Sequence, residues 1–406
     1  MSNKVREISC QAKFNQIFAN VSRLLGVIGF DVLDPDFGPN WKMIYPCAII
    51  FCAMLQILYL LNRSDMVQFL VIVPYAMYEI KLVDIMVQCV AKSGMFQSLK
   101  ARSDEIFELL CENPTNKQVM DKDLKVAIFL QKFIFGWNVQ TSVLMIPGPV
   151  LVWLVSGKMI LFFLYRLPII DDQSAAGFLL NLIYHAAILL IPFCNSGGID
   201  SLLVALIVPI SAFINAIANE VFEINELLET DRRDELAIKT KLNRIARLHQ
   251  LLLEYVSLLE DTFNGMALVR IGTIVLGTIS AIITFFETGD PMTFVFIPVL
   301  FVQLSQCCLL GTIIPVKVAF DTFKFTKYRQ NVCPSLQNEE LIEHLYDIKW
   351  YLLPEGHAKH VSLMLHQAQN APTLTIGKYA PLNVESYEQI LNSIYSFVTF
   401  LITFTG

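Results

Sequence analysis

Long apolar stretches separated by charged segments dominate the pattern of hydrophobic and polar positions along the chain. A helix needs about 20 apolar residues to cross the hydrocarbon layer of a membrane. Seven stretches reach this length: 43–61, 66–90, 127–156, 178–220, 263–286, 291–316 and 384–404. The pattern therefore predicts an all-α membrane protein with seven transmembrane helices.

The fourth stretch is about twice as long as one crossing requires. It is interrupted by Asn195-Ser196-Gly197-Gly198 and continues from Asp200. Two interpretations are open at this point: a re-entrant pair of helices, or one long tilted helix whose ends leave the membrane.

The distribution of Lys and Arg distinguishes the two interpretations. If the fourth stretch crosses once and the N-terminus is inside, cytoplasmic segments hold 24 of the 30 cations and outside segments hold 3. Such an excess on one side is the positive-inside signal, and a second crossing would remove most of it. We therefore expect an inverted topology, with the N-terminus in the cytoplasm and the C-terminus outside. G-protein-coupled receptors have the opposite orientation, and their Asp-Arg-Tyr and Asn-Pro-x-x-Tyr motifs are missing here.

Composition supports the membrane assignment and narrows the function. Hydrophobic residues make up 55% of the chain and charged residues only 16%, against about 25% charged residues in soluble domains. A net charge of −6 gives no reason to expect nucleic-acid binding. The nine cysteines include no CxxC pair, so a disulfide framework is not expected. No signal peptide is visible in the first 42 residues, so we expect the first helix to start insertion.

Two segments on the predicted cytoplasmic side have the spacing of amphipathic helices. In 236–262 the apolar positions are Leu242, Ile245, Leu248, Leu252 and Leu259, and in 339–368 they are Leu341, Leu345, Ile348 and Leu352. We expect these helices to pack on each other and on neighbouring subunits, as a helical assembly layer. Packing within one chain only is the alternative.

The C-terminal third carries the most specific motifs. They are Tyr346-x-x-x-Trp350-Tyr351, Ala368-Gln369, Thr375-x-Gly377-Lys378 and Tyr395-Ser396. In this order they resemble the C-terminal region of insect odorant receptors. The resemblance implies a ligand-gated, non-selective cation channel in the plasma membrane of olfactory sensory neurons. Its implied partners are the odorant co-receptor in a heterotetramer, a small volatile odorant and membrane lipid. A gustatory receptor of the same superfamily is the alternative.

One departure from the family pattern lies before these motifs. In the family the sixth helix runs almost directly into the Tyr-x-x-x-Trp helix, whereas here about twenty-five residues intervene, from Ile314 to Gln337. The stretch is either a cytoplasmic insertion or a translated intron, and we expect it to be dispensable.

The sequence predicts no enzyme, no cofactor and no metal site. His357, His360 and His366 do not line one face of a helix, as metal ligands would have to. Glu79, Lys81 and Asp84 are costly within a membrane helix. We expect them to pair with one another or to reach the interface, in a structural role.

Candidate ligand-binding residues lie in the outer halves of the second, third, fourth and sixth helices. Mostly apolar side chains with a few hydroxyls and amides suit a small volatile molecule. The candidates are Tyr75, Tyr78, Asn138, Thr141, Ser142, Met145, Phe178, Tyr184, Ile188, Phe294 and Phe296.

The last helix carries a polar stripe on an otherwise apolar surface. At about 100° per residue, Asn392, Ser396, Thr399 and Thr403 fall within roughly 60° of one another. Such a stripe lines water or bonds a neighbouring helix. The resemblance places the pore on this helix, with Ser396, Phe400, Thr403 and Phe404 as its predicted residues. Thr403 satisfies both arguments.

These features predict four regions along the chain. Residues 1–42 form a cytoplasmic N-terminal segment, and 43–228 hold the first four transmembrane helices as a ligand-binding bundle. Residues 229–383 hold the fifth and sixth helices with the cytoplasmic helices, and 384–406 form the pore-lining last helix.

Overall fold

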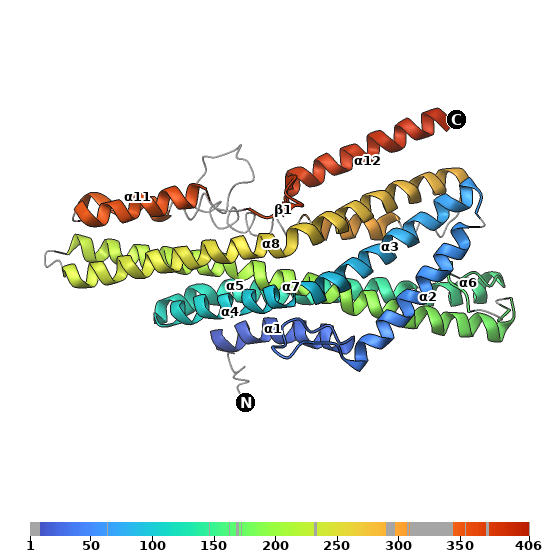
Figure 1. The fold of residues 1–406 in the computed structure, drawn as a ribbon, viewed down its shortest axis with the longest axis horizontal. Helices are drawn as coiled ribbons and strands as arrows, with labels where there is room; N and C mark the ends of the chain where they lie inside the picture. The colour runs from blue at the N-terminus through green and yellow to red at the C-terminus, as the bar shows by residue number, and fades with distance from the viewer. Residues whose placement is uncertain are drawn as a thin grey trace.

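The apolar stretches are helical in the computed structural model. The structure describes residues 9–62, 64–145, 147–161, 163–167, 170–171, 173–230, 234–289, 297–306, 308, 344–353, 355–370 and 373–405; it does not describe the side chains at 66–67, 141–145, 355 and 404–405. The predicted insertion at 314–337 lies outside these residues. Most of the helices run along one long axis (Figure 1).

Helices account for most of the described chain. The α-helices are α1 (Cys10–Val27), α2 (Ile44–Leu61), α3 (Met66–Ala91), α4 (Ser93–Cys111), α5 (Pro114–Met145), α6 (Pro147–Ser156), α7 (Ala175–Glu229), α8 (Glu235–Thr288), α11 (Glu355–Gln369) and α12 (Val384–Thr405). The 3-10 helices are η1 (Trp41–Met43) and η2 (Trp350–Leu352). An apolar helix covers Ile297–Gln306, and β1 (Thr375–Ile376) pairs antiparallel with β2 (Ala380–Pro381).

The helices match the predicted membrane spans in position. The predicted spans 43–61, 66–90, 178–220, 263–286 and 384–404 lie in α2 with η1, α3, α7, α8 and α12, and 127–156 lies in α5 and α6. Within the described residues, Trp41–Leu61, α7 and α8 are long and apolar enough to cross a membrane by length and composition alone. The predicted all-α membrane fold is confirmed.

The long fourth stretch forms one continuous helix. α7 runs for 55 residues through Asn195 and Gly198 and contains two prolines. At 1.5 Å per residue it is about 80 Å long, more than twice the roughly 30 Å of a hydrocarbon core. The re-entrant alternative is therefore wrong. Gly198 lies close to α1, because a Cβ there would lie 2.4 Å from Leu25 Cδ2, so that the leucine side chain would have to shift.

The amphipathic segments bury their apolar faces inside the chain. Leu242, Ile245, Leu248, Leu252 and Leu259 of α8 are all buried in one core with residues of α1, α4, α5 and α7. Leu345 and Ile348 join the same core, and Leu352 packs against it. Leu341 lies outside the described residues. Packing within one chain thus accounts for the apolar periodicity of these segments.

A small hairpin holds the beginning of α12 against α8. The Thr375 backbone N–H donates to Glu260 Oε2 (2.7 Å), and the Gly377 N–H donates to the Asn264 carbonyl oxygen (3.0 Å). Gly377 has φ +59°, and a Cβ there would lie 2.7 Å from Leu268. The Thr-x-Gly-Lys motif is therefore a docking element that needs glycine both for its backbone conformation and for space.

A buried ion pair joins the two longest helices. Arg270 of α8 donates from Nη1 to Asp200 Oδ1 of α7, and the side chains are 4% and 1% exposed. Separating two charges held in an apolar interior is costly, because each is then buried without its partner. The pair therefore favours the register of α7 against α8 in which the two residues meet.

Asp200→Asn should destabilise the protein because Arg270 then stays buried beside a neutral side chain. Removing one partner of a buried pair costs about 3–5 kcal/mol, measurable as a lower unfolding temperature in detergent. The double variant Asp200→Leu with Arg270→Met should recover much of the loss, since it removes both charges. Equal stability of Asp200→Asn and the wild type would contradict the assigned role.

His249 should make folding sensitive to acid. It is fully buried in α8, before the predicted span at 263–286, and burial lowers its pKa to about 4. An unfolded histidine has a pKa near 6.5, so stability should be lost as pH falls from about 6.5 towards 4, by roughly 1 to 2 kcal/mol at about pH 5. The measurement is thermal unfolding at about pH 7.5 and about pH 5. His249→Leu should lose less stability between these two pH values than the wild type does. His360→Leu, at an exposed position, should keep the acid sensitivity of the wild type.

Candidate functional site

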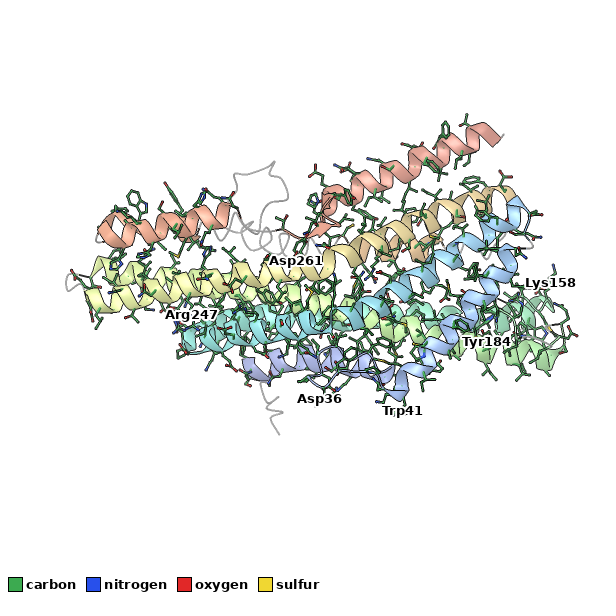
Figure 2. All side chains as sticks on the ribbon, viewed as in Figure 1. Asp36, Trp41, Lys158, Tyr184, Arg247 and Asp261 are labelled. Atoms are coloured by element: carbon green, nitrogen blue, oxygen red, sulfur yellow. The ribbon has the colours of Figure 1, made fainter. Side chains whose placement is uncertain are left out.

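Aromatic side chains gather where α3 and α7 meet the segment that joins α6 to α7. The group, called here the aromatic cluster, consists of Tyr75, Phe163, Tyr165, Tyr184 and His185. It lies near the end of the bundle that holds the α2–α3 turn and α6, where Tyr184 and Lys158 are labelled in Figure 2.

The rings contact one another mainly edge to face. The Tyr75 ring lies 6.3 Å from Phe163 and 6.1 Å from Tyr165, both T-shaped. Phe163 stacks on Tyr165 at 6.0 Å and meets the His185 ring edge-on at 5.2 Å. These are the preferred geometries of aromatic pairs, so the cluster is a well-packed apolar environment.

Polar groups hold the joining segment in place between the helices. The Tyr165 hydroxyl donates to Glu79 Oε1 on α3 (2.9 Å), and His185 Nε2 lies 2.9 Å from the Tyr165 carbonyl oxygen. Gln56 of α2 donates to the Tyr184 hydroxyl (3.3 Å) and accepts from the Arg166 N–H (3.0 Å). The segment is therefore fixed to α2, α3 and α7 by side chains.

The predicted ligand-binding residues lie in several places. Tyr75 and Ile188 are buried in one core, and Tyr184 packs against it. Tyr78 packs against the other large core, with Lys81 Nζ 4.3 Å from its ring centre. Phe178 is buried in a small separate core beside Trp153. Asn138 lies on α5 next to Gly197. The side chains of Thr141, Ser142, Met145, Phe294 and Phe296 lie outside the description.

Sequence reasoning did not select Phe163, Tyr165, His185 or Glu79 for this site. One signal was present: the run Leu161-Phe162-Phe163-Leu164-Tyr165 is strongly apolar for a segment between two spans. An apolar run that is too short to span a membrane predicts burial against the helices.

The three charged residues of α3 bind separate partners. Glu79 accepts from Tyr165, Lys81 donates to Gln303 Oε1 (2.8 Å), and Asp84 accepts from Gln88 (2.8 Å). Residues one or two apart on a helix do not face each other, so Glu79 and Lys81 point to different neighbours. These hydrogen bonds join each of the three residues to another partner, and the expectation that the charges pair with one another or reach the interface stays a prediction.

The polar stripe of α12 lies on its exposed side. Ile394 and Val398 are buried, whereas Asn392, Ser396, Thr399 and Thr403 are exposed and Phe400 is 54% exposed. The Phe404 side chain lies outside the description. In Figure 1 the far end of α12 diverges from the other helices, so its polar side is free to meet other molecules.

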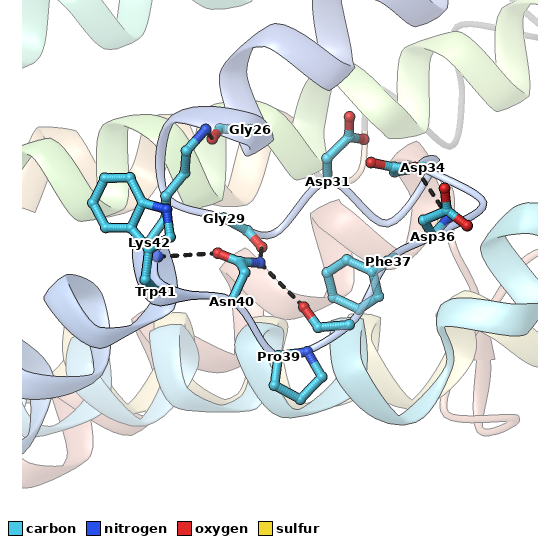
Figure 3. A pocket seen from close by; sticks show the side chains of 11 residues that line it. Gly26, Gly29, Asp31, Asp34, Asp36, Phe37, Pro39, Asn40, Trp41 and Lys42 are labelled. Atoms are coloured by element: carbon cyan, nitrogen blue, oxygen red, sulfur yellow. Dashed lines mark hydrogen bonds between the residues drawn. The ribbon is translucent and has the colours of Figure 1, made fainter.

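Two further hollows lie in the N-terminal part of the chain, one at the turn between α1 and α2 and one between α2 and α3. A polar pocket of about 420 Å³ is formed by the turn between α1 and α2, where Asn40 bonds Gly29, Gly38 and Lys42 and three aspartates lie at the rim (Figure 3). An apolar groove of about 680 Å³ runs between α2 and α3, from Met43 to Val90. The polar lining of the first does not suit an apolar ligand.

Within the described part of the chain, no group of three or more His, Cys, Asp or Glu side chains is placed to hold a metal ion. The His357 and His360 rings lie 6.1 Å apart on α11. The aromatic cluster combines apolar rings with a few hydrogen-bonding groups.

Comparison with known proteins agrees with this architecture. The chain is similar to the insect olfactory receptor OR5 from Machilis hrabei, with a TM-score of 0.70 and 14% identity over 96% of this chain and 98% of that one. The structure of the same receptor in complex with eugenol gives a TM-score of 0.70 and 15% identity, over 96% and 99%. At this identity the similarity demonstrates a shared fold. The family model for the 7tm odorant receptor matches residues 82–319, more than half of the chain. The chain therefore belongs to the 7tm odorant receptor family, as its C-terminal motifs predicted.

Proposed function

We propose that this odorant receptor is the odorant-binding subunit of a heteromeric, non-selective cation channel that it forms with the odorant co-receptor in the plasma membrane of olfactory sensory neurons. The observation that carries the proposal is a shared core. Tyr75, Phe163 and Tyr165 of the aromatic cluster belong to the same buried apolar group as Ile394 and Val398 of α12.

The aromatic cluster supports the binding part of the proposal. A buried apolar site with a few polar groups is what binds small organic molecules, and burial of one apolar side chain contributes about 1.5–3 kcal/mol. The related receptor OR5 has been solved in complex with eugenol. The proposed binding site is therefore centred on Tyr75, Tyr184 and Ile188, with Phe163, Tyr165 and His185 added.

The packing of α12 supports the gating part. Ile394 and Val398 on its buried face lie in the same apolar core as the aromatic cluster. Near its beginning, the Tyr387 hydroxyl lies 2.9 Å from the Ser305 hydroxyl on the Ile297–Gln306 helix. A ligand that shifts the cluster would move α12, since packed cores change between discrete arrangements. The exposed polar face, with Ser396, Thr399 and Thr403, would then line the conducting path.

Exposed aromatics support assembly with other subunits. Trp350 and Tyr351 of η2 are 48% and 66% exposed, and Tyr346, which precedes η2, is 66% exposed. Exposed aromatic groups are typical anchors of protein interfaces. We assign them to contacts with neighbouring subunits.

Topology can be tested directly. An epitope placed after Gly406 should be labelled on unpermeabilised cells, and one placed before Met1 should be labelled only after permeabilisation. The reason is the excess of Lys and Arg in the segments predicted to be cytoplasmic. The reverse labelling pattern would exclude the proposed orientation.

Mutations in the two regions should separate binding from conduction. Tyr75→Leu should change half-maximal odorant concentrations roughly tenfold or more, with reversal potentials unchanged. Thr403→Val should shift cation permeability ratios while the odorant ranking stays the same, and only partially, because co-receptor subunits also line the pore. Dose–response curves and reversal potentials of both variants, co-expressed with the co-receptor, provide the measurement.

Two outcomes would contradict this assignment. Re-ordering of odorants by Thr403→Val, together with altered permeability in Tyr75→Leu, would reverse the two roles. Full odorant currents without the co-receptor would exclude the heteromer and favour the gustatory-type alternative.

A further inference from the structure

Glu79 is a buried acid inside an otherwise apolar cluster. Glu79 is 2% exposed, and its Oε1 accepts a hydrogen bond from the Tyr165 hydroxyl at 2.9 Å. Its Oε2 is buried and has no hydrogen-bond partner among the residues that the structure describes. An unsatisfied buried acceptor costs about 1–3 kcal/mol, and more when it is charged, so this oxygen favours any donor that can reach it.

Among the described residues, no hydrogen bond from the neighbouring charged residues of α3 reaches Glu79 Oε2. Lys81 lies two positions along the helix from Glu79, and such positions do not face each other. Its ammonium group donates to Gln303 at 2.8 Å and lies 4.3 Å from the Tyr78 ring centre. Asp84 accepts from Gln88. The Tyr165 hydroxyl already donates to Oε1.

His185 presents a second unmet acceptor at the other end of Tyr165. Its Nε2 lies 2.9 Å from the Tyr165 carbonyl oxygen, which can only accept, so Nε2 carries the proton. In the neutral ring Nδ1 is then a bare acceptor, and it too is buried without a partner among the described residues. Glu79 and His185 thus each leave one buried acceptor atom without a partner among the described residues.

We propose that Glu79 determines the specificity of this site by accepting a hydrogen bond from the odorant, so that the receptor selects odorants that carry a hydrogen-bond donor such as a hydroxyl or amine group. The inference rests on the proposed odorant-binding function of the aromatic cluster. The aromatic rings hold the apolar body of the ligand, and Glu79 Oε2 meets its donor. An ether or hydrocarbon of the same size leaves the acceptor unpaired and binds more weakly.

Matched odorant pairs test this directly. The probes are n-octanol with its methyl ether and eugenol with its methyl ether, applied to the full-length receptor co-expressed with the co-receptor. In the wild type the hydroxyl compound of each pair should activate at about tenfold lower concentration, the effect of satisfying one buried acceptor that is otherwise left unpaired. The quantity compared between variants is the half-maximal concentration of the ether divided by that of the hydroxyl compound. Surface labelling is the folding control.

Glu79→Gln should bring the two half-maximal concentrations of each pair close together. The amide oxygen keeps the Tyr165 hydroxyl, and the amide nitrogen then donates where Oε2 accepted, to an alcohol oxygen and an ether oxygen alike, so the alcohol loses its advantage. Asp84→Asn is the matched control, because it makes the same chemical change on the same helix outside the cluster, and its ratio should stay at the wild-type value.

Tyr165→Phe provides an independent variant that keeps the acid. It removes the donor from Oε1 and leaves both carboxyl oxygens unmet, so preference for the alcohol should increase. If Glu79→Gln does not reach the surface, this variant decides. The inference would be overturned if Glu79→Gln reached the surface and kept the ratio of the wild type, or if Tyr165→Phe kept that ratio. It would also be overturned if the wild-type receptor responded only to the ethers. A receptor that no odorant of a broad panel activates would instead overturn the proposed function itself.

Discussion

The buried pair of Asp200 and Arg270 is the constraint on which the arrangement of the bundle depends. α7 and α8 are each more than 50 residues long and carry most of the contacts with the other helices. Apolar surfaces of such length can pack in several registers, one helical turn or about 5.4 Å apart. A slip by one turn would leave two buried charges unpaired, so the ion pair selects a single register.

Elements that carry function are attached on both sides of this pair. On one side, Glu260, Asn264 and Leu268 of α8 hold the Thr375–Pro381 hairpin and hence the beginning of α12. On the other side, Ile271 and Ile274 enter the same core as Tyr75 and Val398. α8 therefore contacts both the hairpin that leads into α12 and the core that contains the aromatic cluster. Because the side chains between them are tightly packed, a displacement of the cluster would also displace α12.

The aromatic cluster combines an apolar interior with polar groups that the chain satisfies only in part. Tyr165 uses its hydroxyl on Glu79 and its carbonyl on His185, which fixes the joining segment between α2, α3 and α7. Glu79 Oε2 and His185 Nδ1 are left without a partner among the described residues, and a low dielectric makes each hydrogen bond count for more than it would in water. Under the proposed binding function, these acceptors would distinguish a ligand with a donor group from a similar one that lacks it.

The sequence by itself determined where the helices lie and which family the chain belongs to, because a spanning helix depends only on a local apolar run and the C-terminal motifs are contiguous. It also indicated one continuous fourth helix, through the distribution of Lys and Arg. The tertiary structure decided which residues share the site. Tyr75 and Tyr78 are one turn apart on α3, yet they pack into different cores, while Tyr165 reaches Glu79 from a segment 86 residues away. Periodicity predicts that a helix has a buried face, but the rotation and height of that face against its neighbours are set only when distant segments pack together.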